Sequence, residues 1–252
     1  MTPRLRLIIF LLACIGLMPA FAHVAMRMPS FGAHPLPYGE TINAVATKER
    51  HVTNMVSAVN FDYRGFDTLG EEFMLLCAVT GITVLLRGTR GEQTSARPGV
   101  LEGRPIRPRS EAVMLICRIF GTLTLMFGIY VALHAMTTPG GGFQGGVIIA
   151  SATLMIFMGE TYRGWRRLMH SEILDAIEGG GATLYALCGF ASMVAGKPFL
   201  YNILPLGTPR DLFSGGLMLI ENAGVACAVA GGFAVTFLEF LEETRAEKED
   251  PE

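Results

Sequence analysis

The ionisable residues with the greatest capacity for chemistry in this sequence lie in or beside long apolar stretches. Charged groups are costly in hydrocarbon, so they face the interior of a helix bundle, pair with each other or line an ion path. Asp67 and Glu71 are four residues apart and would share one face of a helix. One of two such carboxyl groups is expected to keep a proton near neutral pH, which suits a proton or sodium relay. The candidates for such a path are Asp67, Glu71, Glu72, His134 and Glu221.

The acidic candidates also have a structural interpretation. Asp67, Glu71 and Glu72 stand where an apolar run begins, and acidic residues stabilise the N-terminus of a helix. Apolar residues flank the pair Glu221–Asn222 for roughly two helical turns on each side. Glu221 therefore either serves an ion path or makes an interhelical hydrogen bond within the membrane.

His134 and Arg118 fall toward opposite ends of one apolar run. A lone histidine at a membrane edge usually just makes a hydrogen bond, although its ordinary pKa near neutrality allows proton transfer. Arg118 lies about one turn into the run. Its side chain either reaches back to the cytoplasmic surface or pairs within the membrane with a carboxylate of another helix.

A glycine-rich segment follows His134 closely. It contains a literal G-x-G-x-x-G from Gly140 to Gly145, but a dinucleotide site needs a preceding strand, and here a predicted membrane helix precedes it. Glycines allow positive φ and close helix approach, so we interpret the segment as a tight, non-helical link at the membrane edge. Its carbonyl groups must be buried in protein or wetted by a cavity, and direct lining of an ion path is the alternative interpretation. The link comprises Thr138, Pro139, Gly140, Gly141, Gly142, Phe143, Gln144, Gly145 and Gly146.

The elements that would position these residues are membrane helices. Hydrophobic residues make up 51% of the chain and charged residues 17%, whereas a soluble domain carries about 25% charged residues. A helix that crosses the hydrocarbon core needs about 20 mostly apolar residues, and about six runs qualify. The sequence thus predicts an all-α membrane protein with helices at about Leu5–Ala22, Leu69–Leu86, Val113–Met136, Gln144–Tyr162, Leu174–Gly196 and Leu212–Phe240.

The first run has two interpretations, because Arg4 and Arg6 precede it and Ala20-Phe21-Ala22 resembles a cleavage site. Residues 1–22 are either a signal peptide or a retained helix. The arginine-rich segment Arg87–Arg109 should be cytoplasmic, which also places both termini inside.

The apolar runs and the polar segments between them divide the chain into four parts. The second of these parts is rich in Gly, Pro and Arg, so we interpret it as a linker. The predicted parts are a two-helix membrane module (1–87), a cytoplasmic linker (88–111), a four-helix membrane domain (112–241) and a charged tail (242–252).

Several functions have no support in the sequence. The net charge of −2 suggests no nucleic-acid partner. The five cysteines all lie within apolar runs without metal-ligand spacing, so we predict no metal and no disulfide. The sequence shows no nucleophile–base set and no cofactor motif, so an enzyme acting alone is not expected.

One family resemblance rests on the glycine-rich link. His134 followed by the segment Thr138–Ile148 is similar to the signature of the MnhB (MrpB) subunit of Mrp-type Na⁺/H⁺ antiporters. The segment Glu221–Val225 resembles the start of that family's last helix. The resemblance covers about residues 110–242. It departs from the family at Met136, near where the family often has a second histidine.

A second resemblance covers the front of the chain. Val59–Glu71 is similar to the signature at the C-terminal end of the large MrpA subunit, which stands alone as the MbhE subunit in membrane-bound hydrogenases. This resemblance implies that Asp67 and Glu71 occupy acidic positions near the family's ion pathway. The chain then resembles an MbhE-like module fused to an MnhB-like domain. The antiporter-like subunits of the family use a lysine within a broken membrane helix. All three lysines of this chain lie instead in predicted loops or the tail.

The two resemblances imply an accessory subunit of a multisubunit complex that exchanges Na⁺, or another monovalent cation, for protons. Its partners would be other Mrp-type or hydrogenase-type subunits and lipid, in the plasma (inner) membrane of a prokaryote. Two alternatives stay open. The chain could be a membrane subunit of a hydrogenase-like or complex-I-like redox pump, or a structural subunit that conducts no ion.

Overall fold

The computed structural model describes residues 3–28, 37–96, 110–160 and 169–243, and every regular element within these ranges is a helix. The chain divides into two compact units, residues 1–41 and 42–252. The first unit contains α1 (Pro3–Arg27), all of whose described side chains are exposed and mostly apolar. A helix that is apolar all round is typical of a membrane span.

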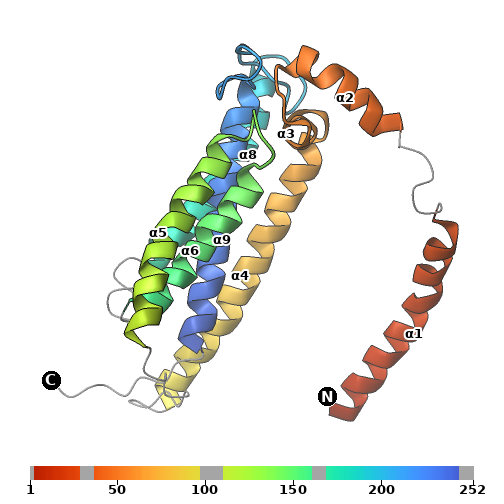
Figure 1. The fold of residues 1–252 in the computed structure, drawn as a ribbon. Coiled ribbons are helices and arrows are strands. Elements are labelled where there is room, and N and C mark those ends of the chain that lie inside the picture. The colour runs from red at the N-terminus through yellow and green to blue at the C-terminus, as the bar shows by residue number, and fades with distance from the viewer. Residues whose placement is uncertain (1–2, 29–36, 97–109, 161–168, 244–252) are drawn as a thin grey trace. The chain divides into compact units, whose positions relative to one another are not determined.

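The second unit is a helix bundle (Figure 1). Within it, α9 packs against α4, α6 and α8, while α5 packs mainly against α6. The elements are α2 (Pro37–Arg50, of which residues 42–50 belong to this unit), α3 (Met55–Ala58), the π-helix η1 (Val59–Tyr63), α4 (Gly65–Ala96), α5 (Glu111–Leu133), α6 (Gly142–Gly159), α8 (Ser171–Val194) and α9 (Leu217–Glu243).

Five helices of the described chain are long and apolar enough to cross a membrane. The sixth predicted span, Leu174–Gly196, forms helix α8 but is not among these five. Three acidic residues and a glycine triplet in α8 lower its hydropathy, and one side of the helix is covered by α9. The protein is therefore an all-α membrane protein, as predicted. The five spans are Leu7–Arg27, Gly65–Leu86, Glu111–Leu133, Gly142–Gly159 and Leu217–Leu241.

Helix ends differ from the predicted ones where polar groups cap the backbone. Helix α5 ends at Leu133 rather than Met136, because His134 is its C-cap and the next turn is not α-helical. Helix α9 begins at Leu217 rather than Leu212, where the backbone N–H of Leu217 donates to the side chain of Asn202. Helix α4 continues to Ala96, into the predicted linker. The rest of that linker up to residue 109, the basic loop 161–168 and the tail from residue 244 lie outside the described residues.

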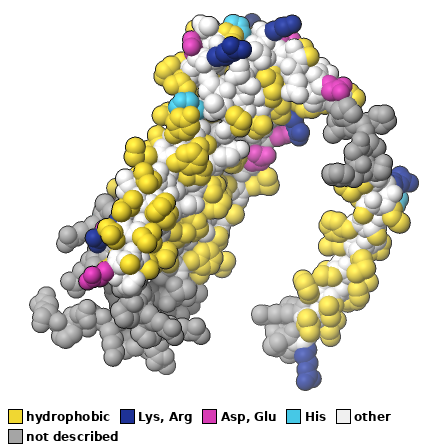
Figure 2. All heavy atoms as spheres, viewed as in Figure 1, with side chains coloured by type: hydrophobic (Ala, Val, Ile, Leu, Met, Phe, Trp, Pro, Cys, Tyr) yellow, Lys and Arg dark blue, Asp and Glu magenta, His cyan; other side chains and the backbone are white. Residues whose placement is uncertain are grey.

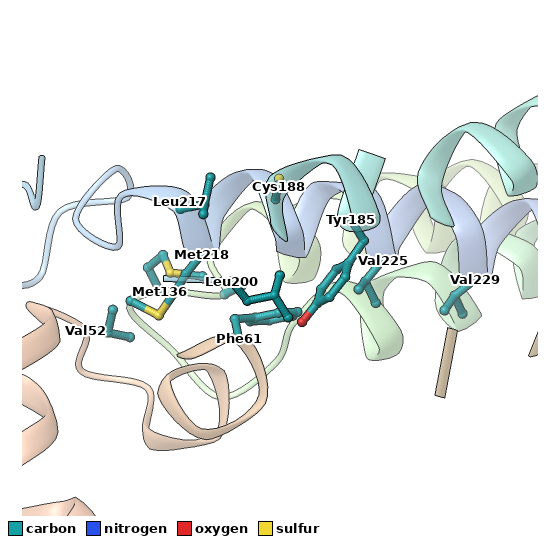
Figure 3. Close-up of a cluster of buried hydrophobic side chains, with 11 residues drawn as sticks. Val52, Phe61, Met136, Tyr185, Cys188, Leu200, Leu217, Met218, Val225 and Val229 are labelled. Carbon is teal, nitrogen blue, oxygen red and sulfur yellow. The ribbon is translucent and has the colours of Figure 1, made fainter. Parts of the chain in front are cut away.

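The surface of the bundle suits lipid. In the view of Figure 2, hydrophobic side chains cover the flank formed by α5 and α6, and charged side chains gather mainly toward the helix ends. The main buried cluster lies where η1 meets α8 and α9 (Figure 3). It contains Val52, Phe61, Ala135, Met136, Tyr185, Cys188, Leu200, Leu217, Met218, Val225 and Val229.

Candidate functional site

The glycine-rich segment is only partly the non-helical link that the sequence predicts. Gly140 and Gly141 make the turn with φ of +146° and +154°, which a side chain at Cβ would disfavour. Helix α6 then begins at Gly142, so Gly142–Gly146 are helical, and that part of the prediction is wrong. The reason is packing: Gly142 and Gly146 lie directly against α9, and Gly145 lies against the end of α5. This close contact outweighs the low helix propensity of glycine.

Carbonyl groups at the start of the link, and in the turn just before it, accept hydrogen bonds from the front part of the chain. The side-chain amide of Asn54 donates to the carbonyl oxygens of Ala135 and Thr138, both at 2.8 Å. The hydroxyl of Ser57 also donates to Ala135, at 2.6 Å, and that of Thr53 donates to the carbonyl of Thr137 at 2.9 Å. These donors meet the requirement that non-helical backbone at a membrane edge be paired, so the link has a structural role here.

The side chain of Asn222 makes two hydrogen bonds to the backbone on the α9 side of the link. Its Oδ1 accepts the N–H of Gly142 at 2.7 Å, and its Nδ2 donates to the carbonyl oxygen of Ala132 at 2.9 Å. The side chain thereby bridges α9, the end of α5 and the start of α6. It is 2% exposed, so water cannot take over these bonds.

Replacing Asn222 by alanine is expected to destabilise the subunit by about 2–4 kcal/mol, because two buried hydrogen bonds are lost and their backbone partners stay unpaired. The expected result is a lower midpoint of thermal unfolding for the purified complex. The control is Gln144→Ala, since Gln144 is an exposed amide in the same segment. Equal midpoints for the two variants would contradict the assigned role.

The acidic residues at the start of α4 point in different directions. Asp67 and Glu71 share one face, as predicted, but both are exposed on this chain, and Asp67 accepts a hydrogen bond from Arg64 Nε at 2.6 Å. Glu72 instead points inward and is 1% exposed. Of these three predicted ion-path candidates, only Glu72 therefore lies in the interior of the bundle. The carboxyl groups of Asp67 and Glu71 lie on its surface, where a neighbouring molecule can contact them.

Besides Glu239 near the end of α9, three carboxyl groups of the described residues lie in the interior, one on each of three helices: Glu72 on α4, Glu178 on α8 and Glu221 on α9. Their side chains are all buried. Both carboxyl oxygens of Glu72, both of Glu221 and one of Glu178 have no hydrogen-bond partner among the described residues. An isolated buried carboxylate is strongly disfavoured, so such groups either carry a proton or meet a cation or water.

The three carboxyl groups lie along one seam rather than around one point. Glu72 lies near Glu178, and the fully buried Tyr185 lies near both Glu72 and Glu221. Glu178 lies beside Gly232, which is about 16 Å along α9 from Glu221 at 1.5 Å per residue. No group of three His, Cys, Asp or Glu side chains in the described residues could hold one metal ion. The seam thus offers a series of single acidic groups.

Of the other two predicted residues, Arg118 lies on α5 and His134 is the C-cap of that helix, which carries none of these three carboxyl groups. His134 stacks on Tyr130 with ring centroids 3.9 Å apart, and its Nδ1 is 2.9 Å from the Tyr130 carbonyl oxygen. Arg118 donates from Nε to the carbonyl of Gly159 at 2.8 Å and forms an ion pair with Glu160 at 2.9 Å. Both residues have partners at the surface of the bundle.

Sequence reasoning did not select Glu178 or Asp62. Glu178 stands in a predicted span directly before three glycines, which was the available signal. Asp62 lies in a predicted loop, and its carboxylate Oδ1 accepts a hydrogen bond from Arg50 Nε at 2.6 Å. Asp62 also interacts electrostatically with Glu221. Burial raises the pKa of Asp62, while the guanidinium of Arg50 opposes that rise.

Fold and seam together define a multi-pass membrane protein with buried acidic groups in its interior. Residues 112–235 match the family described as a domain related to the MnhB subunit of Na⁺/H⁺ antiporters. The B-type Na⁺/H⁺ antiporter subunit of Bacillus subtilis is 31% identical over 131 residues, which cover 50% of this chain and 88% of that protein. The chain belongs to this MnhB family, as the glycine-rich signature predicted.

Other similarities extend beyond the family domain. A probable K⁺/H⁺ antiporter protein of Rhizobium meliloti, of the combined A/B type, is 28% identical over 96% of this chain, which spans 26% of that protein. A chain of the membrane-bound sulfane sulfur reductase, an archaeal respiratory complex, has a TM-score of 0.66 and 24% identity over 94% of this chain and 98% of that one. A chain of the Mrp complex from a Dietzia species has a TM-score of 0.68 and 20% identity, over 100% of this chain and 27% of that one. At these identities the two structures show a shared fold.

Proposed function

We propose that this chain is an accessory membrane subunit of a multisubunit antiporter that exchanges a monovalent cation, Na⁺, for protons across a prokaryotic plasma membrane. In this proposal the seam of Glu72, Glu178 and Glu221 contributes a proton path. The observation that carries the proposal is the burial of these three carboxyl groups on three helices, where most of their oxygens have no hydrogen-bond partner among the described residues. Acidic groups in such places are costly, and function is the usual reason for their presence.

The proposed subunit joins two parts. Residues 1–87 form the MbhE-like module, and residues 112–241 form the MnhB-like domain. The similarity of nearly the whole chain to an antiporter protein of the combined A/B type supports this division. The exposed carboxyl groups of Asp67 and Glu71 would then face a neighbouring subunit, because a charged face of a membrane helix needs a partner or water.

A redox-driven complex is the second candidate. The observation in its favour is that this chain and the chain of the sulfane sulfur reductase complex match over almost their entire lengths. In such a complex the same seam would carry protons, but the driving force would come from electron transfer in other subunits. A third candidate, a subunit that only supports assembly, would make no use of the unpaired carboxyl groups.

Purification of the intact complex from membranes in mild detergent, followed by reconstitution into liposomes, tests the proposal. Large antiporter subunits are expected to co-purify, and addition of Na⁺ is expected to collapse an imposed pH gradient. Co-purification of iron–sulfur subunits, with proton movement that depends on an electron donor, would support the redox candidate instead. A chain that purifies alone would contradict both.

A further inference from the structure

A cavity of about 270 Å³ opens at the end of the bundle where η1 meets the loop between α8 and α9. It lies outside the five candidate spans, next to the buried cluster of Figure 3. Such a volume holds several water molecules, since each occupies about 30 Å³ in the liquid. Its lining combines apolar side chains with polar ones and comprises Arg50, Asp62, Pro198, Phe199, Leu200, Tyr201, Asn202 and Leu206.

The charged groups on the cavity wall are Arg50 and Asp62. Arg50 Nε lies 2.6 Å from Asp62 Oδ1, and the side chains are 33% and 10% exposed. Arg50 is also held over the ring of Tyr63, with its Cζ 5.2 Å from the ring centroid, and Tyr63 donates to Glu49 at 2.9 Å. The ion pair is therefore anchored at the cavity and stabilises the ionised form of Asp62.

Asp62 connects the cavity with the interior seam. It belongs to η1, a single π-helical turn that packs against α9, and such turns often occur at functional sites. The turn buries Phe61, whose ring centroid is 6.4 Å from that of Tyr185, and leaves the next side chain at the cavity. Because η1 packs against α9, Asp62 lies near Glu221, the seam carboxyl group on the first turns of α9.

We propose that this cavity is the aqueous mouth of the carboxyl seam, and that Asp62 passes protons between cavity water and Glu221. This inference rests on the proposed function and adds the site at which protons reach the seam. The ligand of the cavity is water together with the proton it delivers. Arg50 is the fixed counter-charge that holds Asp62 in place after it has lost its proton.

The transfer is balanced in atoms and charge. An O–H bond of protonated Asp62 breaks, and an O–H bond forms on the carboxylate of Glu221, directly or through a water molecule. The negative charge thereby moves from Glu221 to Asp62, where the guanidinium of Arg50 compensates it. Water in the cavity then returns a proton to Asp62. The arginine-rich segment at the C-terminal end of α4 is predicted to be cytoplasmic, and the cavity lies at the opposite end of the bundle. The mouth would therefore open to the outside of the cell.

The first test uses the intact complex in liposomes and the substitution Asp62→Asn, which keeps size and polarity but cannot transfer a proton. Cation/proton antiport is expected to fall by at least about tenfold, whereas Asp62→Glu, which retains a carboxyl group, should stay within about threefold of the unmodified complex. The matched control is Glu160→Gln, since it removes the acid of the ion pair with Arg118, outside the seam. Antiport by Asp62→Asn at the unmodified rate, with Glu221→Gln inactive, would overturn the cavity proposal and leave the proposed function standing.

The second test leaves Asp62 intact, so it tests the role of the cavity even if the Asp62→Asn complex does not assemble. Leu206→Cys places a thiol in the cavity lining, and Thr208→Cys places one on the nearby exposed loop outside it. A bulky, charged thiol reagent is expected to slow antiport of Leu206→Cys by at least about tenfold and to leave Thr208→Cys unchanged. Equal rates for both variants after modification would overturn the proposal.

Discussion

Replacing Glu221 by glutamine is expected to lower cation/proton antiport by at least about a hundredfold while the complex still assembles. Glutamine preserves the volume of this buried side chain but cannot accept and release a proton. Both carboxyl oxygens of Glu221 lack hydrogen-bond partners in the described chain, so no hydrogen bond to the described protein is lost. The measurement is the Na⁺-driven collapse of a pH gradient in liposomes, with the amount of assembled complex determined on the same preparation.

The matched control for Glu221→Gln is Glu172→Gln, which removes an exposed carboxyl group from α8. The control should transport at the unmodified rate. Unchanged transport by Glu221→Gln, with normal assembly, would instead assign Glu221 to interhelical packing. That result would favour the purely structural candidate for the seam.

The second large effect is expected at Gly181, where α8 lies close to α9. A Cβ atom at this position would lie 2.4 Å from the carbonyl oxygen of Gly224 and 2.5 Å from the backbone N of Ala228. Both contacts are with backbone, so relief requires the helices to move apart. Overpacking of this kind costs about 1–3 kcal/mol and sometimes more. Gly181→Ala should therefore lower the thermal midpoint of the purified complex by at least about 2 °C.

The adjacent glycine supplies the control. A Cβ at Gly180 would meet nothing within 4 Å, and alanine favours a helix over glycine by about 0.5–1 kcal/mol. Gly180→Ala should consequently keep or raise the midpoint. The same fall for both variants would show that close contact between α8 and α9 does not limit stability. Such close approach of small residues is a common basis for helix packing in membranes.

The long apolar runs and the glycine turn could be predicted because their physical signals are local. The sequence could not predict which acidic side chains point into the bundle and which point outward. Successive residues on a helix point about 100° apart, so Glu71 and Glu72 face different surroundings. Helix α4 is apolar on most of its circumference, and the sequence therefore does not mark which side is interior. The exposed face holds Asp67 and Glu71, and the seam holds Glu72.

The seam and its mouth also depend on contacts between distant segments. Asp62 becomes a cavity residue only because the segment from Pro198 to Leu206 folds beside it. The adjacent residues Glu221 and Asn222 are both polar side chains in the same apolar run, so the sequence does not separate their roles. The side chain of Asn222 makes hydrogen bonds at both ends of the glycine link, whereas Glu221 has no hydrogen-bond partner in the described chain. Only the packing of α9 separates these two roles.

The central claim is that the buried carboxyl groups of the seam exchange protons when the complex works. Infrared difference spectroscopy of the reconstituted complex measures this directly through the C=O stretching band of protonated carboxyl groups. We predict a difference band from this C=O stretch when a Na⁺ gradient is imposed, and we predict that the band is weaker in Glu221→Gln. A spectrum in which that band does not respond to the gradient, or is identical in Glu221→Gln, would contradict the account.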